Sequence, residues 1–231
     1  MDIRDSFPKN KAPDEVTENP VLSHSGKDEA SQMIMKAAAK LFADKGFEAT
    51  STRDIAQASG LNVSLISYYF GGKVGLYRKI IETFAHQLEA QISSVVESFE
   101  AKGLDQSLFE HEIRTIIEFF VNMRSENPHV GRILKREEVN ALPHSREVYD
   151  QVFSRIGVSL AGLIEKGQRK GFISKKIHPP FAVWALVHMS VDYFTMNECK
   201  SNLNELCFDL PEQKRDLIEQ IFLMFTKGVL K

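Results

Sequence analysis

The stretch of sequence that decides the fold runs from residue 37 to residue 77 and reads AAAKLFADKGFEATSTRDIAQASGLNVSLISYYFGGKVGLY. Its middle part predicts two short helices, 52–59 and 63–70, joined by the turn Gly60-Leu61-Asn62. Ser51-Thr52-Arg53-Asp54 has the form of a capping box, in which the serine and aspartate side chains each accept a hydrogen bond from a backbone amide. Gly60 allows the backbone of a tight turn, and Asn62 caps the second helix. The pattern therefore predicts a helix-turn-helix.

A helix-turn-helix places its second helix in the major groove of DNA and presents its early residues to the base edges. Helix N-termini carry unpaired amides and a partial positive charge, so the starts near Thr52, Asn62 and Lys73 are expected to hold phosphates. Side-chain donors add to these amides. The candidate DNA-binding residues are therefore Thr52, Arg53, Asn62, Val63, Ser64, Ser67, Tyr68, Tyr69 and Lys73.

Apolar residues outside the two short helices recur every three or four positions, which indicates further helices. No stretch alternates apolar and polar residues between turn signals, so strands are not expected. The fold class is all-α, with about nine helices: a small three-helix unit that holds the helix-turn-helix and a larger C-terminal helical bundle. The longer helices are expected at 28–45, 73–101, 106–125, 129–140, 145–170, 179–199 and 211–229.

Charge is unevenly distributed along a chain that is almost neutral overall. The 231 residues hold 29 Lys plus Arg and 31 Asp plus Glu, for a net charge of -2. Residues 27–80, the predicted DNA-binding domain, hold 8 cationic and 5 acidic residues and carry +3. Residues 1–26 carry -2 and are rich in proline, which predicts a disordered leader, and residues 81–231 carry -3. The positive excess therefore lies in the unit that is expected to contact DNA.

Composition excludes several classes of protein. The chain is 43% hydrophobic and 26% charged, which is ordinary for a globular protein. It has neither an apolar run of roughly 18 residues nor an apolar N-terminal signal, so a soluble, cytoplasmic location without membrane contact is expected. Two cysteines, Cys199 and Cys207, fit a reducing compartment, and two unrelated thiols are a better explanation of them than a redox switch. The histidines form no metal motif and no nucleophile stands beside a base, so we expect no metal, no cofactor and no catalytic site.

The quoted stretch resembles the TetR/AcrR family of transcriptional regulators. The resemblance covers about 45 residues and rests on the sequences Ala-x-x-Leu-Phe, Gly-Phe-x-x-Thr, Arg-Asp-Ile-Ala and Tyr-Phe-x-x-Lys-x-x-Leu within it. It implies a homodimer that binds a near-palindromic operator and is typically a repressor released by a small ligand in the C-terminal domain. Asn62, Ser64 and Ser67 depart from the common family pattern, so the operator sequence does not carry over. Together with the sequence YYFGGK at 68–73, these residues look closer to the CecR-like branch.

The C-terminal bundle is expected to hold the ligand and the dimer contacts. Aromatic, methionine and histidine side chains suit an apolar cavity with one polar group, although the same residues would also make a solid core. The candidate pocket residues are Phe119, Phe120, Met123, Trp184, His188 and Met189. The helix at 179–199 is apolar nearly all round and the last helix has a wide apolar face, so both are expected to pair with their copies in a dimer. The candidate dimer-interface residues are Phe181, Leu217, Ile218, Ile221, Phe222 and Phe225.

The predicted mechanism is that a small, hydrophobic ligand in the bundle shifts the long helix at 73–101 and so changes the spacing of the two reading helices on DNA. By thermodynamic reciprocity, DNA then weakens ligand binding to the same degree. Two alternatives stay open on the sequence alone. The same DNA-binding unit serves an activator or a ligand-independent repressor equally well, and a helical small-molecule-binding protein or enzyme with an incidental helix pair is the more distant alternative.

Overall fold

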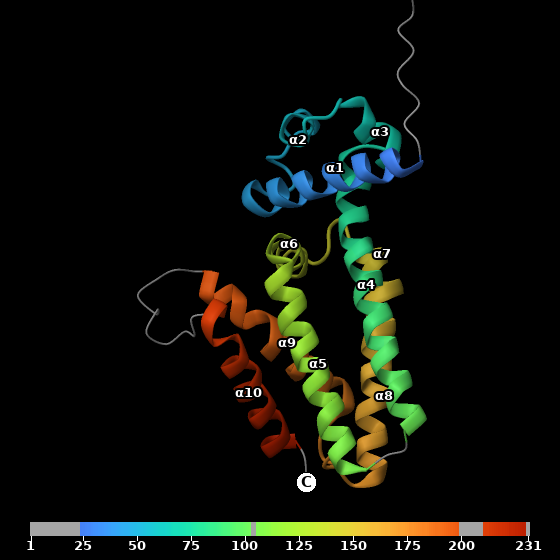
Figure 1. The fold of residues 1–231 in the computed structure, drawn as a ribbon, viewed down its shortest axis with the longest axis vertical. Helices are drawn as coiled ribbons and strands as arrows, with labels where there is room; N and C mark the ends of the chain where they lie inside the picture. The colour runs from blue at the N-terminus through green and yellow to red at the C-terminus, as the bar shows by residue number, and fades with distance from the viewer. Residues whose placement is uncertain (1–23, 103–104, 199–209, 230–231) are drawn as a thin grey trace, which may run out of the picture.

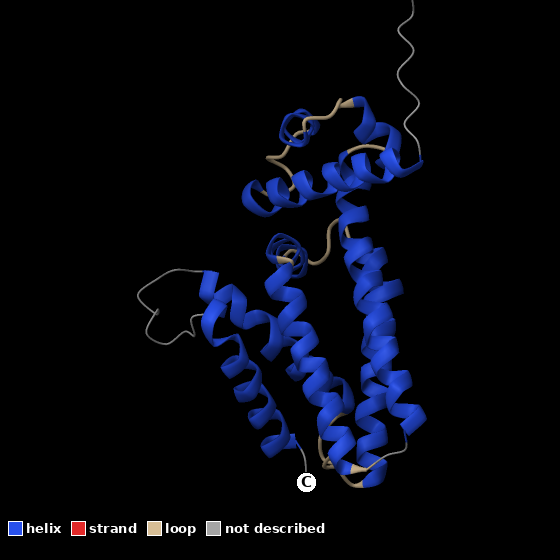
Figure 2. Cartoon of the chain, viewed as in Figure 1, coloured by secondary structure: helices blue, strands red, loops and turns tan. Residues whose placement is uncertain are grey.

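The computed structural model describes residues 24–102, 105–198 and 210–229, and within these ranges the chain is built from helices without any strand (Figure 1, Figure 2). Because α7, η1 and α8 follow one another without a break, the described residues hold nine helical rods, and the all-α prediction is confirmed. The elements are α1 (His24–Lys45), α2 (Thr52–Ser59), α3 (Ser64–Phe70), α4 (Lys73–Lys102), α5 (Gln106–Glu126), α6 (Pro128–Val139), α7 (Arg146–Val148), the π-helical turn η1 (Tyr149–Phe153), α8 (Ser154–Lys170), α9 (Pro179–Glu198) and α10 (Leu210–Val229).

The first three helices form a small unit at one end of the molecule, which we call the head. In Figure 1, α1 crosses the upper end of α4, with α2 and α3 beyond it, while the remaining helices extend downward as a bundle. The head rests on the bundle at two places, because α1 packs against both α4 and α6. One contiguous apolar cluster runs from Ile34 in α1 through the bundle to Phe225 in α10.

Local hydrogen bonds set the turn between α2 and α3 as the sequence predicts. The Asp54 amide donates to Ser51 Oγ at 3.1 Å and the Ser51 amide donates to Asp54 Oδ2 at 3.0 Å, which completes the capping box. The bonds that the Asp54 carboxyl accepts from the Ser51 amide and from the Ser51 hydroxyl lower its pKa. Gly60 ends α2 in the left-handed region with φ 71°, and Asn62 Oδ1 accepts from the Ser64 amide at 2.9 Å. Both helix starts and the turn are therefore fixed by short-range interactions.

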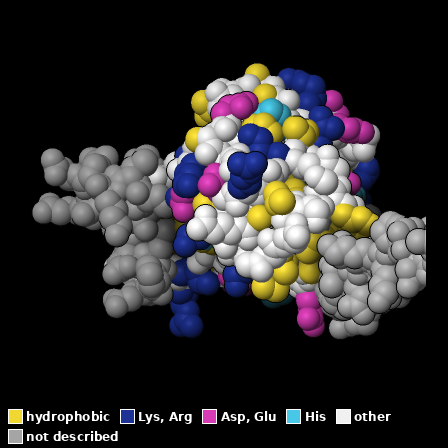
Figure 3. All heavy atoms as spheres, turned by 90° about the horizontal axis from the view of Figure 1, so that it is seen from above, with side chains coloured by type: hydrophobic (Ala, Val, Ile, Leu, Met, Phe, Trp, Pro, Cys, Tyr) yellow, Lys and Arg dark blue, Asp and Glu magenta, His cyan; other side chains and the backbone are white. Residues whose placement is uncertain are grey.

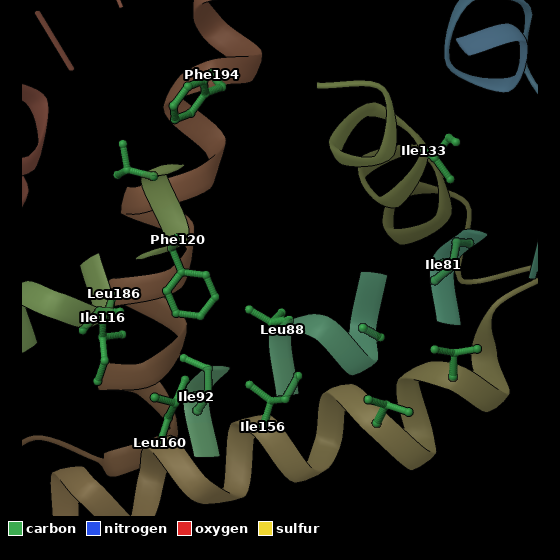
Figure 4. Packing of buried hydrophobic residues seen from close by; sticks show 14 of the residues in the cluster. Ile81, Leu88, Ile92, Ile116, Phe120, Ile133, Ile156, Leu160, Leu186 and Phe194 are labelled. Atoms are coloured by element: carbon green, nitrogen blue, oxygen red, sulfur yellow. The ribbon is translucent and has the colours of Figure 1, made fainter. Parts of the chain in front are cut away.

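The bundle is organised around α4, α5, α8 and α9. Helix α8 packs against α4 and α9, and α5 packs against α9 and α10. Figure 4 shows Leu88, Phe120 and Ile156 reaching toward one another from α4, α5 and α8. All three side chains are buried, at 6% exposure or less. Burial of each such side chain contributes about 1.5–3 kcal/mol, so this centre adds to the stability of the bundle.

The observed helices differ from the predicted ones in two places. Helix α1 begins at His24, inside the range 1–26 predicted as a leader. The helix predicted over 145–170 is continuous but contains the π-helical turn η1, which periodicity does not reveal because it holds only one extra residue. Residues 1–23 and both cysteines, Cys199 and Cys207, lie outside the described residues. None of the helices in the described ranges is long and apolar enough to cross a membrane.

The junction between α3 and α4 requires a glycine. Helix α3 ends at Gly71, with φ 69°, and α4 begins two residues later at Lys73. A Cβ atom built on Gly75 would overlap the carbonyl oxygen of Phe70, so only glycine lets the end of α3 lie this close to the first turn of α4. The orientation of α3 relative to α4 therefore depends on the absence of one methyl group.

Gly75→Ala is expected to lower the free energy of unfolding by about 1–3 kcal/mol, because backbone must move to admit the new Cβ. Urea denaturation followed by circular dichroism measures this. Gly162→Ala is the matched control: it lies inside α8, a Cβ there meets nothing within 4 Å, and stability should stay equal or rise by up to about 1 kcal/mol. Equal effects of the two substitutions would contradict the close approach at Gly75.

Candidate DNA-binding surface and ligand cavity

Helix α3 presents a polar, exposed face at the outer end of the head. Tyr68 is 70% exposed, and Ser64 and Ser67 are exposed with it. Asn62 and Val63, just before the helix, are exposed too, while Ile66 on the opposite side is fully buried in the head. Ile66 thus anchors the helix, with Leu65, Tyr69 and Phe70 half-buried against the core, and the exposed side chains of Ser64, Ser67 and Tyr68 can meet another molecule.

The other predicted DNA-binding residues surround this face, but two of them already have contacts inside the chain. Arg53 is exposed and Thr52 half-buried at the start of α2. Tyr69 is half-buried, with its ring 5.1 Å from the Tyr68 ring. The Lys73 amine donates to the Phe47 carbonyl at 2.9 Å and lies 4.2 Å from the centre of the Phe47 ring. Lys73 therefore holds the loop between α1 and α2, which the sequence did not reveal.

A shallow recess beside α3 adds cationic residues that the sequence analysis missed. Its walls include Lys27 and Ser31 of α1, Tyr68 and Tyr69 of α3, and Lys79 of α4. Figure 3, which looks down on the head, shows Lys and Arg side chains together with some Asp and Glu side chains among uncharged groups on this end of the molecule. Lys27 and Lys79 are about fifty residues apart in sequence, so only the fold reveals that they share a recess with the exposed tyrosine.

A cavity of about 320 Å³ lies in the bundle between α4, α5, α6, α8 and α9. Most of its wall is apolar, and Leu88, Phe120 and Ile156, which Figure 4 shows facing one another, are part of it. The volume is within the range of small-molecule sites. The apolar wall residues are Phe84, Leu88, Phe120, Met123, Leu134, Phe153, Ile156, Leu160, Val183, Val187 and Val191.

Polar side chains gather where the cavity meets α6 and the C-terminal half of α9. The Lys135 amine donates to Asp192 at 3.1 and 3.2 Å, and His188 Nδ1 lies 2.9 Å from the same carboxylate. Burial opposes ionisation of Asp192, but these hydrogen bonds outweigh it and hold the pKa of the carboxyl below its ordinary value. Tyr149 donates to Glu138 at 3.2 Å nearby. Burial and the Glu138 carboxylate raise the pKa of the Tyr149 phenol, so it stays protonated.

Four of the six predicted pocket residues lie on the wall of this cavity: Phe120, Met123, Trp184 and His188. Phe119 and Met189 do not, and their assignment to the pocket is corrected. Phe119 comes one position before a wall residue and Met189 one position after another, which turns each about 100° away around its helix, and both pack against the apolar core instead. The sequence does not reveal Lys135 and Asp192 as wall residues, because they lie 57 positions apart on different helices and form no local motif.

Comparison with known proteins identifies the chain. The model described as "Bacterial regulatory proteins, tetR family" matches residues 34–80, and the model "Tetracyclin repressor-like, C-terminal domain" matches residues 110–224. The two matches together span both the head and most of the bundle. The chain belongs to the TetR family. It is therefore a helix-turn-helix transcriptional regulator, as the sequence predicted.

Curated relatives of this TetR-family chain are also named as regulators. The probable regulator YttP of Bacillus subtilis (strain 168) is 24% identical over 59% of the chain, and the match spans 64% of YttP, less than two thirds of its length. The dual regulator CecR of Shigella flexneri is 27% identical over 63% of the chain and 67% of its own length. The repressor NicS of Pseudomonas putida strain KT2440 is 28% identical over 81% of the chain and 85% of its own length.

The same fold occurs in solved structures. The ketosteroid transcriptional regulator KstR2 of Mycobacterium tuberculosis superimposes with a TM-score of 0.67 over 87% of this chain and 95% of that one. The two sequences are 14% identical, so the similarity is one of fold.

Helix α6 connects the cavity to the head. On one side, Arg136 Nη1 donates to the Phe42 carbonyl of α1 at 2.9 Å, and Arg132 pairs with Asp44 at 3.0 Å. On the other side, Leu134, Lys135 and Glu138 line the cavity. Both arginine contacts fall near the C-terminal end of α1, where cations are favoured. A displacement of α6 at the cavity must therefore strain its bonds to α1.

The Glu137 carboxylate joins α6 to α4. It is 2% exposed and accepts from the Tyr77 hydroxyl at 3.0 Å, from Ser145 Oγ at 2.6 Å and from the His144 amide at 3.1 Å. Burial and the adjacent carboxylate raise the pKa of the Tyr77 phenol, so Tyr77 remains a donor at any physiological pH. Three segments of the TetR-family chain thus converge on one acceptor.

Four of the six predicted dimer-interface residues, Leu217, Ile218, Ile221 and Phe225, are buried within the chain itself. They are at most 8% exposed, because the wide apolar face of α10 is already covered by α5 and α9 of the same chain. Phe222 is half-buried, with the Arg114 guanidinium 4.0 Å from its ring centre. Phe181 is 60% exposed and stacks on Trp184, itself 56% exposed, at 5.9 Å. Among the six, Phe181 is the residue that the chain leaves available.

Within the described ranges, no group of three or more His, Cys, Asp and Glu side chains is arranged to hold a metal ion.

Glu137→Ala is expected to lower the free energy of unfolding by about 2–4 kcal/mol, because three donors lose their buried acceptor. Tyr77→Phe removes one donor and should cost about 1 kcal/mol. Urea denaturation at a fixed protein concentration measures both. Glu165→Ala, at an exposed ion pair with Arg169, is the matched control and should change stability by less than about 0.5 kcal/mol. A small effect of Glu137→Ala would show that the connection between α6, α4 and the loop before α7 does not depend on this carboxylate.

Proposed function

We propose that this TetR-family chain is a homodimeric repressor that binds a palindromic operator through two copies of α3 and leaves it when a small molecule occupies the cavity. The observation that carries the proposal is the exposed polar face of α3 on a scaffold fixed by the capping box and the turn at Gly60. Two such helices in successive major grooves would read two half-sites. Since the chromosome is its target, we place the regulator in the cytoplasm.

The proposed DNA contacts are divided between bases and phosphates. Asn62, Val63, Ser64, Ser67 and Tyr68 are exposed on or beside the reading helix and are assigned to the groove. Thr52, Arg53, Tyr69 and Lys73 flank it and are assigned to the phosphates, with Lys27 and Lys79 of the recess added to them. Phosphate contacts fix the register of the protein, whereas base contacts provide specificity.

The proposed release of DNA depends on a displacement of α6. A molecule in the cavity would press on Leu134, Lys135 and Glu138, and α6 would pass this displacement to α1 through Arg136 and to α4 through Glu137. The tilt of the two heads would then no longer match the spacing of the half-sites. The free energy by which the ligand weakens DNA binding must equal the free energy by which DNA weakens ligand binding.

Selection of bound sequences from a random DNA library with the purified full chain tests the function directly. A palindromic site is expected, and its affinity should fall steeply as salt concentration rises, because cationic side chains displace counterions from phosphates. Recovery of no preferred sequence, with retardation equal for all DNA, would overturn the proposal.

Tyr68→Ala is expected to weaken operator binding about 5-fold to 100-fold, the effect of losing one good contact of about 1–3 kcal/mol in the groove. Since Tyr68 is 70% exposed, the fold and thermal stability should stay unchanged. Electrophoretic retardation on the selected site measures the affinity. Val139→Ala, which trims a 75% exposed side chain outside the head, is the control and should bind as the unaltered chain does. Unchanged binding by Tyr68→Ala would remove this residue from the contact surface.

Phe181→Asp is expected to convert the dimer to monomers and to abolish tight operator binding, because a charge in a buried apolar interface has no partner. Sedimentation velocity measures the mass. Val158→Asp introduces the same charge at another exposed apolar position, 72% exposed on α8, and serves as the comparison. A dimer that survives Phe181→Asp but not Val158→Asp would move the interface from α9 to α8.

A further inference from the structure

We infer that the cavity is built for an uncharged amphipathic molecule of about ten to fifteen non-hydrogen atoms, with a hydroxyl group at one end of an apolar body. This inference rests on the proposed function, since it takes the cavity as the effector site. It is carried by three observations: the size of the cavity, the separation of its polar and apolar walls, and the charge balance of its polar side chains.

The volume limits the size of the occupant. At about 30 Å³ for each water molecule, a cavity of about 320 Å³ has room for roughly ten of them, and because covalently bonded atoms lie closer together than water molecules, about ten to fifteen non-hydrogen atoms fit. A single ring with a short side chain fits.

The wall is polar at one end only. Leu88, Phe120, Ile156 and Val183 come from the middle of the bundle, whereas Lys135 and Glu138 come from α6, next to the head. Figure 1 shows α6 next to the head, above α5 and the main part of α8. An occupant with one polar and one apolar end therefore has a defined direction, with its polar end toward α6.

The ionised side chains at the polar end already balance one another. Lys135 pairs with Asp192 at 3.1 Å and lies 3.9 Å from Glu138, and Arg124 supplies a second cation on the wall. Two cations thus face two carboxylates. An anionic or cationic occupant would lose its hydration without finding an excess of opposite charge, whereas a neutral one avoids this penalty.

The histidine specifies what kind of neutral group fits. An ionised carboxylate only accepts hydrogen bonds, so the proton between His188 and Asp192 is on Nδ1, and in the tautomer that carries this proton alone Nε2 is an acceptor. Lys135 donates to both oxygens of Asp192 and has a third N–H. A hydroxyl group matches this pair, because it donates to a ring nitrogen and accepts from an ammonium group at the same time. The adjacent Trp184 ring, 4.8 Å from the imidazole, offers a flat surface to an aromatic body.

Three probes with the same apolar body and different end groups test the inference: 4-pentylphenol, 4-pentylbenzoate and 4-pentylbenzylammonium. Isothermal titration calorimetry with the full chain at neutral pH should give the tightest binding for the phenol, with the anion and the cation each at least tenfold weaker. Equal or tighter binding of either ion would overturn the inference, and so would the absence of binding by all three. This comparison needs no variant.

Asp192→Asn sharpens the test, because it leaves Lys135 without its ionic partner and gives the wall one net positive charge. Binding of 4-pentylbenzoate should then tighten at least tenfold and binding of the phenol should weaken. Asp216→Asn, the same change at an exposed site on α10, should alter neither. If Asp192→Asn keeps the same order of affinity for the three probes and has a native circular dichroism spectrum, the charge-balance argument is overturned.

Operator binding without any probe is measured in parallel. Tight phenol binding by a chain that recognises no DNA sequence would overturn the proposed function while supporting the ligand class. Sequence-specific DNA binding together with a preference for the benzoate would overturn the ligand class alone.

Discussion

The Glu137 carboxylate is the point on which the arrangement of head and bundle depends. Its three hydrogen bonds join α6, the first turns of α4 and the loop before α7. A buried carboxylate is unfavourable unless its oxygens are fully paired, so these three segments have little freedom to separate one at a time. This connection therefore behaves as a unit: the Glu137 carboxylate either keeps all three hydrogen-bond donors or the three segments rearrange together.

This constraint explains how a cavity in the bundle can influence a surface in the head. Helix α6 carries cavity wall on one face and contacts to α1 and α4 on the others. Densely packed protein transmits displacement rather than absorbing it. A molecule that enters beside Lys135 thus acts on the head through one short helix of 12 residues, and no longer chain of contacts is needed.

The sequence predicts the head well because its determinants are local. The capping box at Ser51, the turn at Gly60 and the cap at Asn62 each act over two to four residues, and each forms as expected. The cavity is less predictable, because Lys135 and Asp192 meet only after α6 and α9 are packed. A dimer interface is hard to predict for a similar reason: periodicity shows that Leu217 and Phe225 are buried, but not whether this chain or its partner buries them.

The π-helical turn η1 has a consequence for how the cavity is shaped. Tyr149 and Phe153, at the two ends of this turn, line the cavity, followed by Ile156 in the regular helix beyond. Loss of a single residue from this turn would restore ordinary helical spacing and rotate everything before it by about 100° relative to α8. The shape of the binding site is thus tied to chain length at this position. Relatives with and without the insertion would present different side chains to the cavity even where every residue type is the same.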